Sequence, residues 1–178
     1  MNEWGYNINQ IAKLNNISVG SVFKVVKELE KHGIVFKNQI SNASYYQLNV
    51  DNCETIALCE FLLLRQKKDI KGYVKVYADE IMAFKQAEII ILFGSILKRK
   101  DYNDVDVLFV TNHVKKVHDF CLHISQIRTK PVVPFILKKE DIIEHIQQKH
   151  EVVLNIIKQG VLLKGQRTFL EVVQRVRA

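Results

Sequence analysis

The fold of this chain is decided by residues 88–110, which read EIIILFGSILKRKDYNDVDVLFV. A short apolar run, Ile89 to Phe93, has the length and composition of a buried β-strand. The run stops at Gly94-Ser95, and a basic segment leads into a second apolar run that contains Asp104-Val-Asp106. The pattern predicts a strand, a bend and a second strand with two aspartates near its start.

The two aspartates are the first candidate site. Side chains i and i+2 lie on one face of a strand, so Asp104 and Asp106 should point the same way while Val105 and Val107 point into the core. Two carboxylates roughly 7 Å apart along a strand repel each other unless a cation lies between them. Oxygen ligands of this kind suit Mg²⁺ that also holds substrate phosphates. We therefore predict a metal site at this pair.

The bend before the aspartates has the features of a phosphate site. Gly94 lets the backbone come close to a ligand, and Ser95 adds a hydroxyl where we expect a helix N-terminus, which favours anions. Lys98, Arg99 and Lys100 follow, and their charges either meet phosphate or stand in a solvated loop. The predicted nucleotide-binding residues are Gly94, Ser95 and Lys98.

Composition limits the classes of protein to consider. The chain has 178 residues and 48% hydrophobic residues, enough for one domain or two small ones. No apolar stretch approaches the ~18–20 residues needed to span a bilayer, and the N-terminus lacks the layout of a signal peptide. The three cysteines form no CxxC pair, which argues for a reducing compartment and against a zinc or disulfide scaffold. We predict a cytoplasmic protein that does not enter membranes.

The charge is basic and uneven. The formal net charge is +7. Residues 1–50 carry five lysines against three glutamates, and residues 111–178 carry twelve Lys or Arg against six acids. A basic balance favours polyanionic partners, either nucleic acid or nucleotide phosphates.

Residues 7–35 have the pattern of a helix-turn-helix. Asn7 or Asn9 can cap a short helix that ends before Asn15-Asn16, and Ser18 can cap a second helix from Val19 to His32. Apolar residues of the second helix recur at helical spacing, namely Val22, Val25, Val26 and Leu29. Short apolar segments at 34–36 and 45–48 follow, separated by a polar stretch, and they predict a two-stranded wing.

This N-terminal part resembles winged helix-turn-helix DNA-binding domains, although the usual first helix is absent or reduced to residues 1–6, where Trp4 and Tyr6 would cover the exposed side. The resemblance implies that the second helix enters the major groove of double-stranded DNA. The implied contacts are Ser18, Ser21, Lys24 and Lys27, with Lys37 of the wing on phosphate. The alternative is a winged helix used only for dimerisation or packing.

The remaining segments are predicted from periodicity. A strongly apolar helix at 54–67 should connect the two halves and could form the seam of a homodimer. The prolines at 131 and 134 place a strand at 130–137 on an edge of the sheet. The other predicted elements are helices at 73–85, 113–128, 140–150, 151–159 and 168–177 and a strand at 161–163.

The stretch Leu92-Phe-Gly-Ser95, eight residues, then Asp104-Val-Asp-Val-Leu108 resembles the signature of minimal nucleotidyltransferases of the DNA polymerase β-like superfamily. The resemblance implies that Asp104 and Asp106 are catalytic and bind Mg²⁺, and that Gly94 and Ser95 hold the triphosphate of an NTP. It also implies transfer of a nucleoside monophosphate to a hydroxyl of a protein or nucleic acid. Related minimal nucleotidyltransferases act as antitoxins that modify or bind a partner toxin.

The family's third carboxylate has no clear counterpart. The strand that should supply it, within 132–137, contains no acid, and Glu140 and Asp141 are more simply explained as helix-starting residues. Two hypotheses therefore stand. The chain is an Mg²⁺-dependent nucleotidyltransferase targeted by a winged helix, or a catalytically inactive DNA-binding transcriptional regulator that uses the nucleotidyltransferase fold to sense a nucleotide or to dimerise.

The predicted fold class is α+β. We expect a winged helix-turn-helix at 1–50, a helical connector at 51–86 and a nucleotidyltransferase-like domain at 87–178, with a mixed sheet and helices on one of its faces.

Overall fold

The protein is described by a computed structural model that covers residues 5–99 and 101–177. The fold is α+β, as predicted, with two separate sheets. The chain forms two compact units, residues 1–59 and 60–178. Among the described residues, no helix has both the length and the apolar character needed to cross a membrane.

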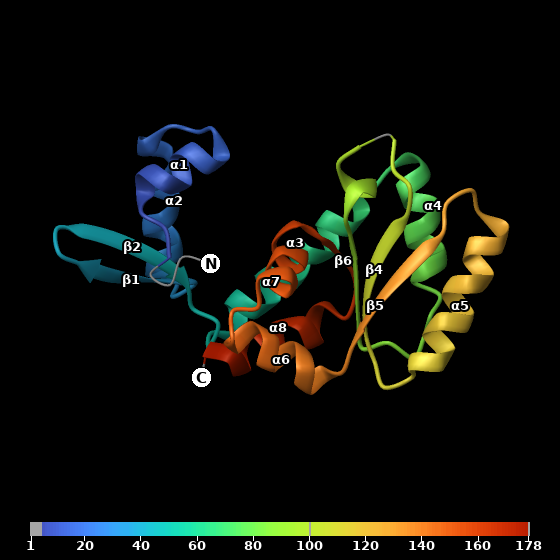
Figure 1. The fold of residues 1–178 in the computed structure, drawn as a ribbon. Helices are drawn as coiled ribbons and strands as arrows, with labels where there is room; N and C mark the ends of the chain where they lie inside the picture. The colour runs from blue at the N-terminus through green and yellow to red at the C-terminus, as the bar shows by residue number, and fades with distance from the viewer. Residues whose placement is uncertain (1–4, 100, 178) are drawn as a thin grey trace. The chain divides into compact units, whose positions relative to one another are not determined.

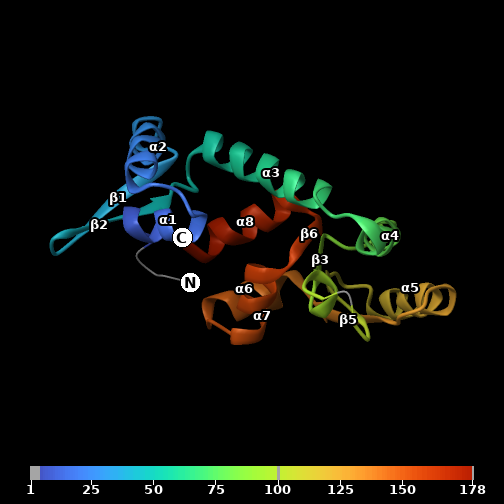
Figure 2. The same cartoon turned by 90° about the horizontal axis from the view of Figure 1, so that it is seen from above.

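The N-terminal unit begins with the predicted helix-turn-helix (Figures 1 and 2). Asn7 caps α1 (Ile8–Asn15) by accepting a hydrogen bond of 2.9 Å from the backbone of Gln10. Asn16 turns the chain in the left-handed region at φ 54°. Ser18 then caps α2 (Val19–Lys31) by accepting from the backbone of Ser21 at 3.1 Å. Local capping chemistry therefore sets both helix starts.

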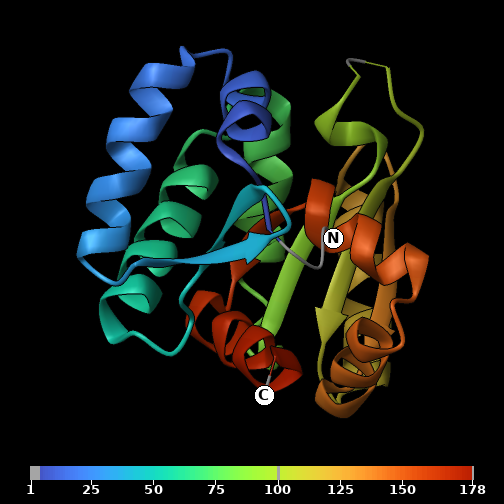
Figure 3. The same ribbon diagram turned by 90° about the vertical axis from the view of Figure 1, so that its left-hand side faces the viewer.

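The wing is longer than the sequence predicts. Strands β1 (Val35–Ile40) and β2 (Ala43–Leu48) pair antiparallel and meet at a turn of two residues, Ser41 and Asn42 (Figure 3). The polar stretch expected as a loop lies inside these strands, because a ribbon exposed to water needs few apolar side chains. Tyr6 adds an isolated antiparallel bridge to Tyr46, whereas Trp4 lies outside the described residues.

The core of the N-terminal unit is small. It contains Ala12, Val22, Val26, Ile34, Val35 and Tyr46. Val25, which the spacing placed on the apolar face of α2, is instead 56% exposed. The buried stripe of α2 is narrower than its apolar stripe because α2 packs mainly against α1 and β1. Helix α3 (Cys53–Lys68) follows, and Thr55 near its start donates to the carbonyl of Ile34 at 3.2 Å.

The second unit is built on a mixed sheet with strand order β5-β4-β3-β6. β3 pairs antiparallel with β4 and with β6, and β4 pairs parallel with β5. β5 lies on an edge, as Pro131 before the strand and Pro134 within it predict. The strands are β3 (Ile89–Phe93), β4 (Val105–Val110), β5 (Val132–Leu137) and β6 (Val161–Lys164).

Helices cover both faces of this sheet, and the expectation of helices on one face is corrected (Figure 1). α4 (Gly72–Ile81) and α5 (Val114–Ile127) pack against the side chains of Ile90 and Leu92. The opposite face, with Ile89 and Ile91, is covered by α6 (Lys139–Gln147), α7 (Glu151–Gln159) and α8 (Gln166–Arg177). Consecutive apolar residues in β3 therefore serve two cores, which explains why the strand is an unbroken apolar run.

Candidate functional site

The structure brings the glycine-serine bend and the second aspartate together. Phe93, the last residue of β3, pairs with Asp106 of β4, so Asp106 stands beside the bend that follows β3. Gly94 has φ 85° and ψ −156°, a conformation that strains any residue with a side chain. A Cβ added at Gly94 would also overlap the carboxylate of Asp106. Glycine is therefore required at this bend by the backbone and by the neighbouring acid.

The two aspartates influence each other electrostatically. Asp106 points to the sheet face of Leu108 and Val110, whereas Val105 and Val107 are buried in the opposite core. Burial raises the pKa of Asp106, and the negative charge of Asp104 raises it further. Both carboxylates remain partly exposed to solvent. Asp106 therefore stands beside a bend that has no side chain of its own, and Asp104, which precedes β4, is near enough to act on its charge.

The conformation of the residues after Gly94 differs from the predicted one. Ser95 begins a 3-10 helix of three residues, Ser95–Leu97, rather than an α-helix, so the expected helix dipole does not act on a ligand here. The carbonyl of Ser95 accepts from the backbone of Lys98 and of Arg99, each at 2.9 Å. The Lys98 ammonium donates to the side-chain oxygen of Gln159, at the end of α7. Lys100 lies outside the described residues.

Residues 5–99 and 101–177 contain no cluster of three or more His, Cys, Asp or Glu side chains that could hold a metal ion. Val133 of β5 stands opposite Asp106, at the position where a neighbouring strand could most directly supply an acid. Asp141 accepts from the backbone of Lys138 at 3.1 Å and so caps α6. The donor set fits one Mg²⁺ shared with nucleotide phosphates, because Mg²⁺ is commonly held by one or two carboxylates and substrate phosphates.

The second candidate site is the exposed side of α2. At about 100° per residue, Lys24, Lys27 and Lys31 fall on the side of the helix opposite the buried Val22 and Val26. Lys31 was missed by the sequence analysis, although its spacing of seven residues from Lys24 could have identified it. The three lysines form a basic stripe along α2, bordered on one side by the exposed acid Glu28, which lies one turn after Lys24.

Lys27 has the most defined surroundings of the predicted DNA contacts. Its ammonium lies 2.7 Å from Glu30, and this hydrogen bond is the main cause that raises the pKa of Lys27, with the nearby phenol of Tyr46 adding to it. Lys37 of the wing pairs across the ribbon with Tyr46. Tyr46 therefore interacts electrostatically with Lys27 of α2 and pairs across the ribbon with Lys37 of the wing. Ser18 and Ser21 are hydrogen-bonded to each other, 2.8 Å apart, at the start of α2.

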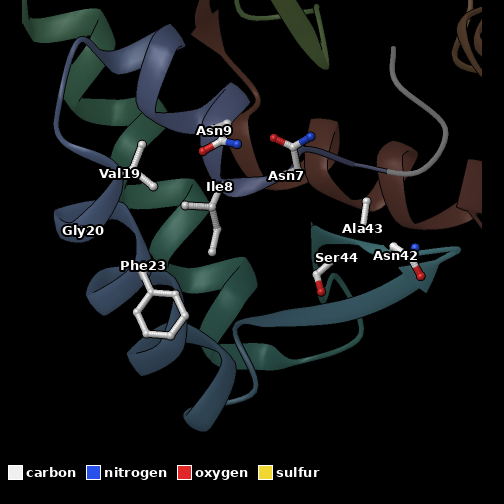
Figure 4. A pocket seen from close by; sticks show the side chains of 9 residues that line it. All are labelled: Asn7, Ile8, Asn9, Val19, Gly20, Phe23, Asn42, Ala43 and Ser44. Carbon is white, nitrogen blue, oxygen red and sulfur yellow. The ribbon is translucent and has the colours of Figure 1, made fainter.

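A surface hollow of about 560 Å³ lies beside these residues. It is lined by the start of α1, the first turns of α2 and the tip of the wing (Figure 4). The lining residues are 7–9, Val19, Gly20, Phe23 and 42–44. The hollow thus lies entirely within the N-terminal unit, between α1, α2 and the wing.

Comparison with known proteins bears on the N-terminal unit and α3. Residues 3–68 match the family model of the B-block binding subunit of TFIIIC. The matched segment ends at Lys68, the last residue of α3. No curated protein matches the chain.

Proposed function

We propose that this chain binds double-stranded DNA through the winged helix of its N-terminal unit. The observation that carries the proposal is the match of residues 3–68 to a B-block binding subunit over a segment that folds as a helix-turn-helix with a wing. In this proposal α2 is the recognition helix, and its basic stripe neutralises phosphates. The role suits a transcriptional regulator better than an enzyme that acts on its own.

The proposed DNA-contacting residues should contribute unequally to the affinity for DNA. Lys24 and Lys31 are exposed and can approach phosphates directly. Lys27 must exchange Glu30 for a phosphate, so its contribution is smaller. Ser18 and Ser21 hold the start of α2 and can offer their hydroxyls to the backbone of the DNA, and Lys37 extends the contact along the wing.

The test is fluorescence anisotropy of a labelled duplex at several salt concentrations. Nonspecific binding with a dissociation constant on the order of 10⁻⁴–10⁻⁶ M is expected at physiological salt. Lys24→Ala should weaken binding and reduce the slope of log K against log salt by about one. Lys116→Ala is the matched control, because Lys116 is an exposed lysine of α5 in the second unit. Undetectable binding, or equal slopes for the parent and Lys24→Ala, would reject the proposal.

A second function is favoured by the contact between the Gly94 bend and the Asp106 carboxylate. We propose that the second unit binds a nucleoside triphosphate with one Mg²⁺, held by Asp104 and Asp106. A bound Mg²⁺ would neutralise phosphate charge. Transfer of a nucleoside monophosphate to a hydroxyl needs a further carboxylate, which the described residues do not bring to this place. Binding is therefore proposed in preference to catalysis.

Isothermal titration calorimetry with ATP tests this second function. Binding should require Mg²⁺ and should be lost in Asp106→Asn, which removes a charged ligand while keeping the shape of the side chain. Asp119→Asn, an exposed acid on α5, should bind as the parent does. Binding that survives in Asp106→Asn, or that needs no Mg²⁺, would place the nucleotide elsewhere.

The chain is also proposed to form a homodimer through α3. Leu58, Phe61, Leu62 and Arg65 recur at the spacing of one helix face, and Phe61 and Leu62 are each 55% exposed. Glu54 lies near the start of this face and Arg65 near its end, so an antiparallel pair of α3 helices would bring opposite charges together at both ends.

A further inference from the structure

The most unusual feature of the proposed recognition helix is the apolar surface beside its basic stripe. Phe23 and Val19 are each 50% exposed, and both line the hollow together with Gly20 (Figure 4). We propose that Phe23, with Val19, contacts the methyl groups of thymine in the major groove and so gives the winged helix a preference for thymine. This inference rests on the proposed binding of duplex DNA.

The position of Phe23 places it where base edges would come. It lies about 100° around α2 from the buried Val22, on the side that faces the start of α1 and the wing tip. It also belongs to the N-terminal half of α2, the part of a recognition helix that approaches bases. The side chain is therefore outside the core, between the buried residues and the lysine-bearing side, and one turn before Lys27.

The chemistry of the groove matches an apolar side chain at this position. Thymine presents a methyl group on the floor of the major groove, and phenylalanine is one of the side chains that contacts it. A Cβ at Gly20 would meet no protein atom within 4 Å, so this position leaves open space next to Phe23. A base edge can therefore approach α2 more closely at Gly20 than it could over a larger side chain.

The setting of the hollow favours DNA over an apolar protein as the occupant, because its lining is uncharged while lysines stand outside it on α2 and β1. Lys24 follows Phe23 directly, and Lys37 lies on the wing. Asn9 and Asn42 add amide groups from two other edges of the hollow. A polyanion with apolar methyl groups between its phosphates satisfies this combination, because the methyl groups can enter the uncharged hollow while the phosphates meet exposed lysines outside it.

The experiment combines a change in the DNA with a change in the protein. The full-length chain is titrated against a duplex of alternating dA and dT, and against the same duplex with uracil in place of thymine, which removes only the methyl groups. The parent should bind the uracil duplex about four-fold more weakly for each methyl group contacted. Phe23→Ala should bind both duplexes equally and about as weakly as the parent binds the uracil duplex.

Two controls separate the methyl contact from other effects. Val25→Ala removes a comparably exposed apolar residue two positions away on α2, outside the hollow, and should keep the full difference between thymine and uracil. In a duplex of alternating dC and dG, methylation of cytosine places a methyl group at the equivalent position and should strengthen binding by the parent but not by Phe23→Ala.

The outcomes are distinct. Equal binding of the thymine and uracil duplexes by the parent overturns the inference while leaving DNA binding intact. A difference that persists in Phe23→Ala also overturns it, because the DNA shape would then be the cause. Failure to bind any duplex overturns the inference together with the proposed function. A change of oligomeric state in Phe23→Ala, measured by sedimentation, would assign the hollow to a protein partner instead.

Discussion

Substitution by alanine should have opposite effects on stability at two glycines. Gly94 sits at φ 85° against the carboxylate of Asp106, whereas Gly20 lies in α2 with open space where a Cβ would go. Gly94→Ala should lower the free energy of unfolding by about 1–3 kcal/mol or more, because backbone strain and overlap act together. Gly20→Ala should raise it by at most about 0.5–1 kcal/mol, the value for a helix interior, because Gly20 lies in the first turn of α2. Urea denaturation measures both changes, and a neutral Gly94→Ala would show that the bend is not constrained.

Asp106 should make the protein less stable as pH rises. Its pKa in the folded chain is raised above the ordinary 3.8, first by burial and then by Asp104. Between these two pKa values the folded state binds more protons than the unfolded state, so stability falls with rising pH, and the full deficit is present above the folded pKa. Asp106→Asn should therefore be more stable than the parent near neutrality, and the difference should disappear as pH falls below 3.8.

The check is urea denaturation of both proteins across that pH window. A difference that grows toward acid pH would contradict the prediction, because it would mean that the ionised Asp106 is stabilised in the fold. Added Mg²⁺ should raise the melting temperature of the parent and leave that of Asp106→Asn unchanged, since a ligand stabilises only the state that binds it.

Some features of the candidate site could be predicted from the sequence, and others could not. Strand periodicity was enough to place Asp106 on the face opposite Val105 and Val107, since it depends only on a repeat of two. Asp104 precedes β4, so the same repeat does not fix the direction of its side chain. The partner of Lys98 could not be predicted, because Gln159 is 61 residues away and is brought near by the tertiary fold. The prediction of an α-helix starting at Ser95 was wrong, because only three residues adopt the 3-10 conformation before the chain turns toward β4.

Elements with strong local signals were predicted closely. β3 and α7 have the predicted bounds, Ile89–Phe93 and Glu151–Gln159, because an apolar run and a terminal glycine mark them. The wing strands were predicted too short, since β-strands exposed to water carry no apolar signal. The second helical layer was missed because an unbroken apolar strand shows that both faces are buried but does not show by what.

The exposed stripe of α3 formed by Leu58, Phe61 and Leu62 gives a prediction about the oligomeric state. If a second copy covers this stripe, Leu62→Glu should shift the protein from dimer to monomer, because a charge would be buried in the seam. Leu64→Glu is the matched control, because Leu64 lies about 200° around the helix from Leu62 and is also exposed. Sedimentation equilibrium measures the mass of each variant. A monomeric parent, or equal dissociation of both variants, would rule out this seam.

At the scale of the whole molecule, the two proposed ligand-binding sites lie in different compact units. The basic stripe and the hollow belong to residues 1–59, and the Gly94 bend and the aspartates belong to residues 60–178. Each unit also has a buried core of its own. Sites that share no residues and no core usually contribute independently to the energetics of a protein.

The two binding activities should therefore be separable. Lys24→Ala should weaken DNA binding and leave the Mg²⁺-dependent binding of ATP unchanged, and Asp106→Asn should do the reverse. The doubly substituted protein should show both losses, with free energies that add to within about 0.5 kcal/mol.

The dissociation constant for duplex DNA, measured with and without Mg²⁺ and ATP, tests whether the two sites are independent. If ATP changes that constant in the parent but not in Asp106→Asn, the two sites are coupled, and by reciprocity DNA must change the affinity for ATP by the same factor. That result would contradict independence and would establish the second unit as a nucleotide sensor for the first.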